Sequence, residues 1–314
     1  MDSETLSWSL FARYVPAYGK PIEGMDIALF RALPETIWFF FQEDRLLTAS
    51  GTYVVGIGYD AHAVGNHSLP LGGNVLDWVE SVTAVHPLGT FDGHPCCAVQ
   101  AAADSDRREP GSDGFWTGVP DGFHWQPLRE VIPTLDGDAG FLAGRALQIL
   151  NWRRNNQFCG RCGTEMEPRA DERAMACPKC GFLQYPRLSP AIIVAVTRGD
   201  ALLLAHGNHF PAGMYSIVAG FVEPGETFED CISREVQEEI GIRVKDIRYL
   251  SSQPWPFPDS LMVGFTAEWA SGGIQVDGVE IGDAKWYTRE AMPSIPGPHS
   301  IAGRIIRKWL NGPL

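Results

Sequence analysis

The C-terminal half of the chain alternates short apolar runs with amphipathic segments. Residues 191–196 (AIIVAV) and 201–205 (ALLLA) flank a turn at Arg198–Gly199–Asp200, which predicts a buried hairpin. Further apolar runs predict strands at 214–218, 244–251, 262–269 and 284–287, and helices at 228–240 and 300–310. A helix between strands on either side predicts a mixed sheet sandwiched by helices.

The first 155 residues contain shorter apolar runs. They predict strands at 36–41, 46–49, 52–57, 82–88 and 97–102. Residues 61–73 are rich in glycine, histidine and asparagine and are expected to be a loop. Apolar residues at helical spacing predict a helix over 138–155. This region is therefore expected to be a mixed α+β domain, and we find no catalytic pattern in it.

The predicted helix at 228–240 carries an unusual distribution of charge. Thr227 is a suitable N-cap, and apolar residues step along one side of the helix. Glu235, Glu238 and Glu239 fall on one arc beside that apolar stripe. Carboxylates three and four residues apart repel each other, so helix propensity alone does not favour this arrangement.

Two interpretations of this acidic segment are open. Residues 220–242 hold seven carboxylates against the single base Arg234. A solvated acidic helix face is the simpler interpretation. Glycines flanking a glutamate-rich loop and helix instead favour a site that collects hard divalent cations. From these residues alone both interpretations stay open, and the cation site becomes the preferred one only with the family resemblance given below. We expect Arg234 to orient Glu226 or its loop by a charge-assisted pair.

Composition narrows the class of protein. The 314 residues are 45% hydrophobic and 20% charged, which is ordinary for a globular protein. No apolar run reaches the roughly 18 residues that a membrane span needs. The N-terminus lacks the order of a secretory signal, so we expect a cytoplasmic protein. The net charge of −13 argues against non-specific binding of nucleic acid by the surface as a whole.

Four of the seven cysteines have the spacing of a metal site. Cys159 and Cys162 form one CxxC pair, and Cys177 and Cys180 form a second after fourteen residues. Two such turns supply four thiolates to a tetrahedral zinc ion and leave no open position, so one structural Zn²⁺ is expected. Unrelated thiols or a redox pair are the weaker alternatives. The neighbourhood is basic, which fits either a solvated module or a local contact with nucleic acid.

The acidic segment resembles the motif of a known family. Its spacing matches every position of the Nudix box, through Gly220, Glu226, Arg234, Glu235, Val236, Glu238, Glu239, Gly241 and Ile242. Proteins of that family hydrolyse a diphosphate linked to another group. Residues 252–260 (SQPWPFPDS) in turn resemble the signature of the NADH pyrophosphatase branch. The paired CxxC motifs with Tyr185–Pro186 also resemble that branch.

The resemblance implies roles for particular residues. Glu235, Glu239, Glu280 and the backbone carbonyl of Ala219 are expected to bind two or three Mg²⁺ or Mn²⁺ ions. Glu239 is the first choice for accepting the proton of the attacking water, and Glu238 binds a cation or supports a carboxylate that does. Substrate contacts are expected from Tyr185, Phe221, Gln253, Pro254, Trp255, Pro256, Phe257, Pro258, Asp259, Ser260 and Ala302. From the residues alone, Trp255 fits either substrate binding or packing on the sheet.

Together these observations predict an α+β chain in three parts. An N-terminal NADH-pyrophosphatase-like domain is expected at 1–155, a zinc ribbon at 156–186 and a Nudix domain of α/β/α sandwich type at 187–314. The implied activity cleaves NAD(H) to NMN(H) and AMP, and removes NAD caps from RNA 5′ ends, in a homodimer. The alternatives are a Nudix hydrolase of another nucleoside diphosphate derivative such as ADP-ribose, and a non-catalytic zinc-ribbon protein that binds nucleotides or RNA.

Overall fold

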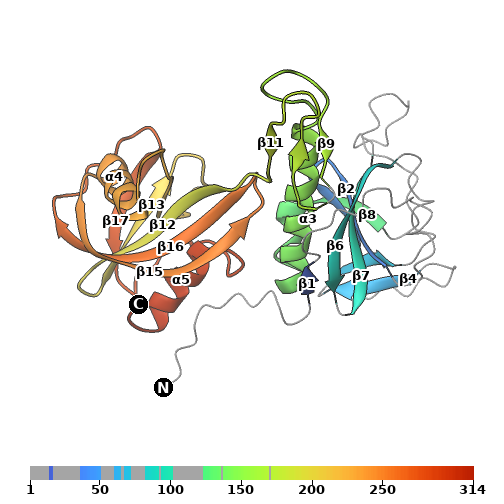
Figure 1. The fold of residues 1–314 in the computed structure, drawn as a ribbon. Coiled ribbons are helices and arrows are strands. Elements are labelled where there is room, and N and C mark those ends of the chain that lie inside the picture. Colours follow the sequence, from blue (N-terminus) through green and yellow to red (C-terminus); the bar gives the residue numbers. More distant parts are fainter. Residues whose placement is uncertain are drawn as a thin grey trace. The chain divides into compact units, whose positions relative to one another are not determined.

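The chain folds into two compact units that divide between Arg187 and Leu188. The structure is a computed structural model (Figure 1). It describes residues 14–16, 36–50, 60–64, 67–71, 82–91, 93–101, 123–135, 137–169 and 171–314. The strand expected at 52–57 lies outside the described residues. Among the described helices, none is long and apolar enough to cross a membrane.

The N-terminal unit is built on an eight-stranded sheet with the order β1-β6-β7-β2-β3-β5-β4, in which β8 pairs with β3. The strands are β1 (Tyr14–Pro16), β2 (Ile37–Gln42), β3 (Arg45–Ser50), β4 (Asp60–Val64), β5 (His67–Leu71), β6 (Val82–Phe91), β7 (His94–Ala101) and β8 (Phe123–Pro127). All six residues of β2 are buried, as expected for a central strand that pairs in parallel with β7.

Two helices follow this sheet, α2 (Leu128–Val131) and α3 (Gly137–Asn155). Helix α3 confirms the helix expected at 138–155 and packs against β2, β6 and β7. The loop expected at 61–73 is wrong, because β4 and β5 occupy most of it as an antiparallel pair. The composition of this stretch favours turns, and it gives no sign that the two strands pair with each other.

A small three-stranded sheet closes the N-terminal unit. It has the order β11-β10-β9 and consists of β9 (Glu167–Pro168), β10 (Met175–Ala176) and β11 (Leu183–Gln184). The four predicted zinc ligands cluster here with Trp152, Met166 and Met175. Because this core has so few apolar members, the cysteine cluster is a large part of what holds the module together.

The C-terminal unit contains a six-stranded mixed sheet with the order β15-β16-β12-β13-β17, in which β14 pairs with β12. The strands are β12 (Ser189–Arg198), β13 (Ala201–Gly207), β14 (Val218–Phe221), β15 (Arg243–Trp255), β16 (Ser260–Ser271) and β17 (Ile281–Tyr287). Strands β12 and β16 are parallel, and the other pairs are antiparallel. The strand expected at 214–218 begins only at Val218.

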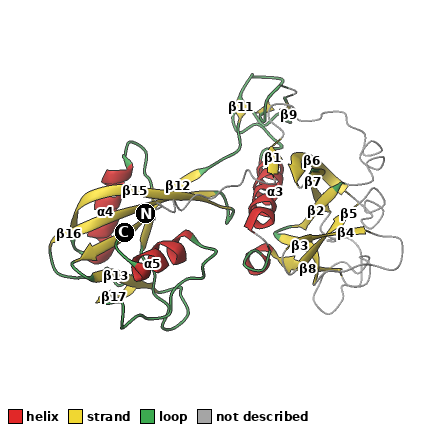
Figure 2. Ribbon diagram, turned by 90° about the horizontal axis from the view of Figure 1, so that it is seen from below, coloured by secondary structure: helices red, strands yellow, loops and turns green. Residues whose placement is uncertain are grey.

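Helices cover both faces of this sheet, which confirms the expected sandwich (Figure 2). Alternate residues of β12 point to opposite faces: Ile192 and Val194 pack with α4 (Phe228–Ile240), whereas Ile193 and Ala195 pack with α5 (Ile301–Asn311). Every residue from 191 to 196 is buried. The two apolar faces of one strand therefore hold both helices.

Helix α4 begins and ends at strong capping residues. The Thr227 hydroxyl accepts the Asp230 N–H, and the Asp230 carboxylate accepts the Thr227 N–H, which forms a capping box. Gly241 ends the helix in the left-handed conformation at φ 78°. The helix expected at 228–240 is therefore confirmed at both ends, and its acidic arc has a defined position.

Candidate active site

The acidic face of α4 lies directly against strand β14. A Cβ atom built on Gly220 would lie only 2.0 Å from the Glu235 Cδ atom. No Cβ atom can lie this close to another carbon, so the absence of a side chain at Gly220 is what lets the Glu235 carboxyl lie against the strand. The contact places the Glu235 carboxyl beside the segment that carries the Ala219 carbonyl.

Substituting Gly220 by alanine is expected to displace the Glu235 side chain without unfolding the domain. The added methyl group can be accommodated only if Glu235 swings away, because the neighbouring strand backbone is fixed by pairing with β12. We expect kcat/KM for pyrophosphate hydrolysis to fall by about 10- to 100-fold. Alanine at Gly273, which has open space around it, is the matched control, and equal activity of the two variants would contradict the prediction.

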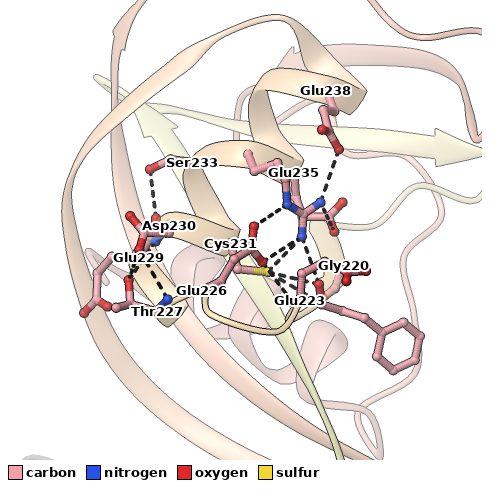
Figure 3. Close-up of polar contacts among 12 residues, drawn as sticks. Gly220, Glu223, Glu226, Thr227, Glu229, Asp230, Cys231, Ser233, Glu235 and Glu238 are labelled. Carbon is pink, nitrogen blue, oxygen red and sulfur yellow. Dashed lines mark hydrogen bonds and ion pairs between the residues drawn. The ribbon is translucent and has the colours of Figure 1, made fainter.

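Arg234 forms the centre of an ion-pair network with Glu226, Glu235 and Glu238, the three partners labelled in Figure 3. Its guanidinium donates to both carboxylate oxygens of Glu226, to Glu235 at 2.8 Å, to Glu238 at 3.2 Å and to the Phe221 carbonyl at 3.0 Å. These hydrogen bonds hold the pKa of Glu226 down at about 2. The charge-assisted pair expected between Arg234 and Glu226 is therefore present.

Glu239 has an electrostatic environment different from that of its neighbours. It is 8% exposed, and burial, followed by the charges of Glu235, Glu280, Asp277 and Glu238, raises its pKa to about 8. Burial also raises the pKa of Glu235, although Arg234 opposes that effect. Arg234 thus balances part of the negative charge of these carboxylates, and the repulsion that remains acts on Glu239.

This repulsion predicts an unusual dependence of stability on pH. A carboxyl whose pKa rises on folding stabilises the protein below its unfolded pKa, and this contribution is lost as pH rises through the folded value of about 8. Without divalent cations, the free energy of unfolding is therefore expected to fall by roughly 1–2 kcal/mol between pH 6 and 8. Thermal melts over that range should show the fall in the wild type and in Glu229→Gln.

The same melts identify the group responsible. Glu239→Gln carries no titrating carboxyl at that position and should show a shallower fall. Added Mg²⁺ should also flatten the wild-type curve, because it binds the deprotonated form. Parallel curves for the wild type and Glu239→Gln would contradict the assignment.

A cavity of about 660 Å³ brings several predicted residues together in the C-terminal unit. Glu239, Glu280 and Ala219 line it, and so do Gln253, Trp255 and Ala302. Apolar lining residues include Ile193, Ile217, Met262 and Ile301. An apolar cavity with a few converging polar groups is the usual form of a small-molecule site.

Gln253, which lines this cavity, has one buried side-chain atom without a hydrogen-bond partner. Its side chain is 4% exposed, and its Nε2 atom donates to the His299 carbonyl at 2.9 Å. Its Oε1 atom is buried and has no hydrogen-bond partner. A buried amide oxygen without a partner is costly, so this side chain is a marked departure from the usual pairing of buried polar groups.

The signature at 252–260 forms the end of the β15–β16 hairpin, because β15 continues to Trp255, beyond the strand end expected at residue 251. Gln253, Pro254 and Trp255 belong to β15, and Ser260 starts β16 and pairs with Trp255. The tip is anchored to β12, where the Ser189 hydroxyl donates to the Asp259 carboxylate at 2.9 Å. The Trp255 and Phe257 rings contact edge to face. Because β15 and β16 pair up to Trp255 and Ser260, the backbone that carries Trp255 is held in position.

Other predicted residues do not line this cavity. Phe221 ends β14 with 54% exposure, and Tyr185 belongs to the N-terminal unit, where its hydroxyl donates to Glu172. Glu235 and Glu238 lie on the Arg234 network. The remaining hairpin-tip residues, also not on the cavity wall, are Pro254, Pro256, Phe257, Pro258, Asp259 and Ser260.

Several cavity residues were not expected from the sequence. Asn208, Ser216, Pro296 and Ser300 all line it, and none belongs to a motif. They come from four separate segments, so no spacing along the chain links them. Only the turn signals around Asn208 and Pro296 could have marked these segments as exposed to a ligand.

The acidic residues fit divalent cations such as Mg²⁺ or Mn²⁺. Glu239, Glu280 and the residue Ala219 face one cavity, and Glu235 is close enough to raise the pKa of Glu239. Carboxylate and carbonyl oxygens are the ligands that these hard cations prefer. Bound cations would relieve the repulsion around Glu239 described above.

The four cysteines have the geometry of a zinc site. Among the described residues, theirs is the one cluster of this kind with all ligand atoms within 4.8 Å of one another. The Sγ–Sγ distances are 3.6 Å for Cys159–Cys180, 3.5 Å for Cys162–Cys177 and 3.6 Å for Cys162–Cys180. A tetrahedron with Zn–S bonds of about 2.3 Å has edges of about 3.8 Å. The cluster therefore fits one structural Zn²⁺.

Comparison with known proteins agrees with this geometry. The model of the NUDIX domain matches residues 187–310, the NADH pyrophosphatase zinc ribbon domain matches 154–185, and the NADH pyrophosphatase-like rudimentary NUDIX domain matches 35–152. Similar proteins include two called "NAD-capped RNA hydrolase NudC". The one from Stutzerimonas stutzeri (strain A1501) is 46% identical over 223 residues, which are 71% of this chain and 76% of the relative.

The second of these, from Pseudomonas aeruginosa (strain LESB58), is 47% identical over 209 residues, covering 63% of this chain and 75% of the relative. Among solved structures, a NUDIX hydrolase from Nitrosomonas europaea is similar, with 21% identity and a TM-score of 0.43. That match covers 49% of this chain and 90% of the other.

Proposed function

The chain belongs to the Nudix hydrolase family, in its NADH pyrophosphatase branch, and on this premise we propose that it hydrolyses the pyrophosphate of NAD(H) to NMN(H) and AMP. The same cleavage at an RNA 5′ end would remove an NAD cap and leave a 5′-monophosphate, the activity for which the relatives are named. One observation carries the proposal. Glu239 and Glu280 line the same cavity as Gln253 and Trp255 of the hairpin signature.

The reaction adds one water across a phosphoanhydride. The water oxygen forms a bond to one phosphorus, the bond from that phosphorus to the bridging oxygen breaks, and Glu239 accepts the proton of the water. Burial and neighbouring carboxylates raise the pKa of Glu239 in the cation-free site, and bound cations would favour the ionised form that accepts a proton. Glu235, Glu239, Glu280 and the Ala219 carbonyl would hold Mg²⁺ or Mn²⁺, with Glu238 nearby. These cations neutralise phosphate charge and lower the pKa of bound water.

The rest of the cavity is suited to a nucleotide base. The free Oε1 atom of Gln253 can accept an N–H from an adenine amino group or a carboxamide. Trp255 and the exposed Phe221 offer flat apolar surfaces for stacking, and the small side chain of Ala302 leaves room in the cavity. Tyr185 and the remaining hairpin-tip residues, Pro254 and 256–260, are proposed as further contacts.

Free dinucleotide and capped RNA differ in what they require outside the cavity. The net charge of −13 disfavours a long RNA-binding surface. Around the zinc cluster, Arg169 is already paired with Asp171 and Glu172, and Arg161 lies over the Phe182 ring. We therefore propose that the protein recognises RNA only at its NAD end. We also propose that it is a cytoplasmic homodimer, and light scattering can check the mass of the dimer.

The decisive experiment compares kcat/KM for NADH, NAD⁺ and an NAD-capped RNA, with ADP-ribose as the competing substrate. Mass spectrometry should identify NMN(H) and AMP from the dinucleotides, and NMN with 5′-monophosphate RNA from the capped RNA. Turnover of ADP-ribose above the other three would favour a Nudix hydrolase of different specificity. Binding of NAD(H) without turnover in Mg²⁺ or Mn²⁺ would favour the non-catalytic alternative.

A further inference from the structure

The turn that carries Glu280 is held by the side chain of Asp277. Its carboxylate accepts three backbone N–H groups, from Val279 at 3.2 Å, Glu280 at 3.0 Å and Ile281 at 2.9 Å. These bonds also hold the pKa of Asp277 below its usual range. Three charge-assisted hydrogen bonds to consecutive amides leave the backbone on either side of Glu280 little freedom.

Asp277 is also joined to the helix that carries Glu239. Its own N–H donates to the Glu239 carbonyl at 3.3 Å, and the nearby Gln275 N–H donates to the Ile240 carbonyl at 2.8 Å. The residue therefore connects the last turn of α4, through its backbone, with the Glu280 turn, through its side chain. Glu239 and Glu280 lie 41 positions apart in the chain, yet this one residue bridges their backbones.

Asn208, which follows β13, holds the opposite side of the same turn. Its Nδ2 atom donates to the Val279 carbonyl at 2.8 Å and the Gly278 carbonyl at 3.4 Å, and its N–H donates to the Glu280 carbonyl at 2.9 Å. Asn208 is itself confined, because a Cβ atom on Gly282 would lie 2.4 Å from its Oδ1 atom. The backbone N–H groups of the turn thus donate to Asp277, and the backbone carbonyls of the turn accept from Asn208.

We propose that Asp277 and Asn208 are positioning residues that fix Glu280 relative to Glu239, and that this fixed spacing sets the affinity of the site for divalent cations. The proposal rests on the proposed function, which makes both glutamates cation ligands. Two facing carboxylates repel, so a free turn would move Glu280 away whenever no cation is bound. Because the fold already holds Glu280 in place, cation binding does not have to supply the free energy to bring Glu280 back toward Glu239.

An Asp that caps its own turn is common, and a purely structural role is the competing explanation. The two roles differ in what they change. A structural role alters thermal stability and leaves the cation dependence of the folded protein as it was. A positioning role raises the Mn²⁺ concentration needed for half-maximal activity and leaves most of kcat at saturating Mn²⁺.

Asp277→Ala removes all three acceptor bonds, and Asp277→Asn keeps one carbonyl oxygen as a partial rescue. Gly282→Ala deletes no hydrogen-bonding group and only pushes against Asn208, so it tests the other half of the clamp independently. Asp200→Asn, at the opposite end of β13 and fully exposed, is the matched control. Mn²⁺ binding to each free protein is measured by electron paramagnetic resonance, alongside NADH turnover against Mn²⁺ concentration.

We expect Mn²⁺ binding to weaken by about 10- to 100-fold in Asp277→Ala, less in Asp277→Asn and Gly282→Ala, with no change in Asp200→Asn. The half-activating Mn²⁺ concentration should rise by the same factors. Unchanged Mn²⁺ affinity in both Asp277→Ala and Gly282→Ala, in protein that melts normally, would overturn the proposal. Because the binding measurement needs no substrate, it decides this point even if wild-type protein fails to cleave NADH, a result that would count against the proposed function alone.

Discussion

Replacing Glu239 by glutamine is expected to lower kcat for NADH hydrolysis by about 10²- to 10⁴-fold. The change keeps the shape of the side chain but removes its negative charge and its ability to accept a proton. Glu239 lines the cavity, is nearly buried, and has the strongest raised pKa among the glutamates of α4. No other α4 carboxylate combines these properties, so a replacement for it within the helix is not available.

Glu229→Gln provides the matched control for this experiment. It makes the same chemical change on the same helix, in the exposed first turn. We expect it to keep wild-type kcat and KM. Full turnover by Glu239→Gln at saturating Mg²⁺ would remove Glu239 from the mechanism. A rise in KM alone, with kcat retained, would also do so, because it would make Glu239 a binding group only.

Replacing Cys177 by serine is expected to abolish stoichiometric zinc binding and unfold the small module around the cluster. Structural zinc sites contribute about 10–16 kcal/mol of binding free energy in isolated zinc-finger peptides, and folding depends on that energy. Cys177 is 2% exposed and its Sγ atom lies 3.5 Å from that of Cys162. The apolar core of the module is too small to compensate.

Metal analysis should find about one zinc per wild-type chain, as four thiolates in a closed tetrahedron bind one ion, and far less in Cys177→Ser. Limited proteolysis should cut the variant within residues 156–186, whereas Lys179→Ala, an exposed change in the same turn, should resist it. A variant that keeps its zinc, or wild-type protein without zinc and with four reactive thiols, would refute the zinc-ribbon interpretation.

Local chemistry made some elements predictable and left others hidden. Helix α4 could be placed to the residue because Thr227 and Gly241 are strong caps and the apolar stripe between them is regular. The buried hairpin of β12 and β13 was predictable from two continuous apolar runs. In contrast, β4 and β5 depend on pairing with each other and with β3, and their glycine- and histidine-rich setting gives no such signal.

Some residues of the candidate site could likewise be predicted from the sequence, and others could not. Glu235 and Glu239 could be identified because they share one helix and one motif. Glu280 was placed only through the resemblance, since its approach to Glu239 depends on Asp277 and on a cavity formed by distant segments. The free Oε1 atom of Gln253 was beyond sequence reasoning altogether. It follows from which hydrogen bonds the fold leaves unmade.

The hairpin formed by β15 and β16 has a consequence for how this family can diversify. Its tip, from Trp255 to Ser260, is tied to β12 through Asp259, and β15 pairs with β16 along its length. The carboxylates of α4 belong to a separate element, packed on the sheet by its own apolar stripe. A substitution at the tip therefore need not displace these carboxylates, so the specificity and the hydrolytic chemistry that we propose can change independently of each other.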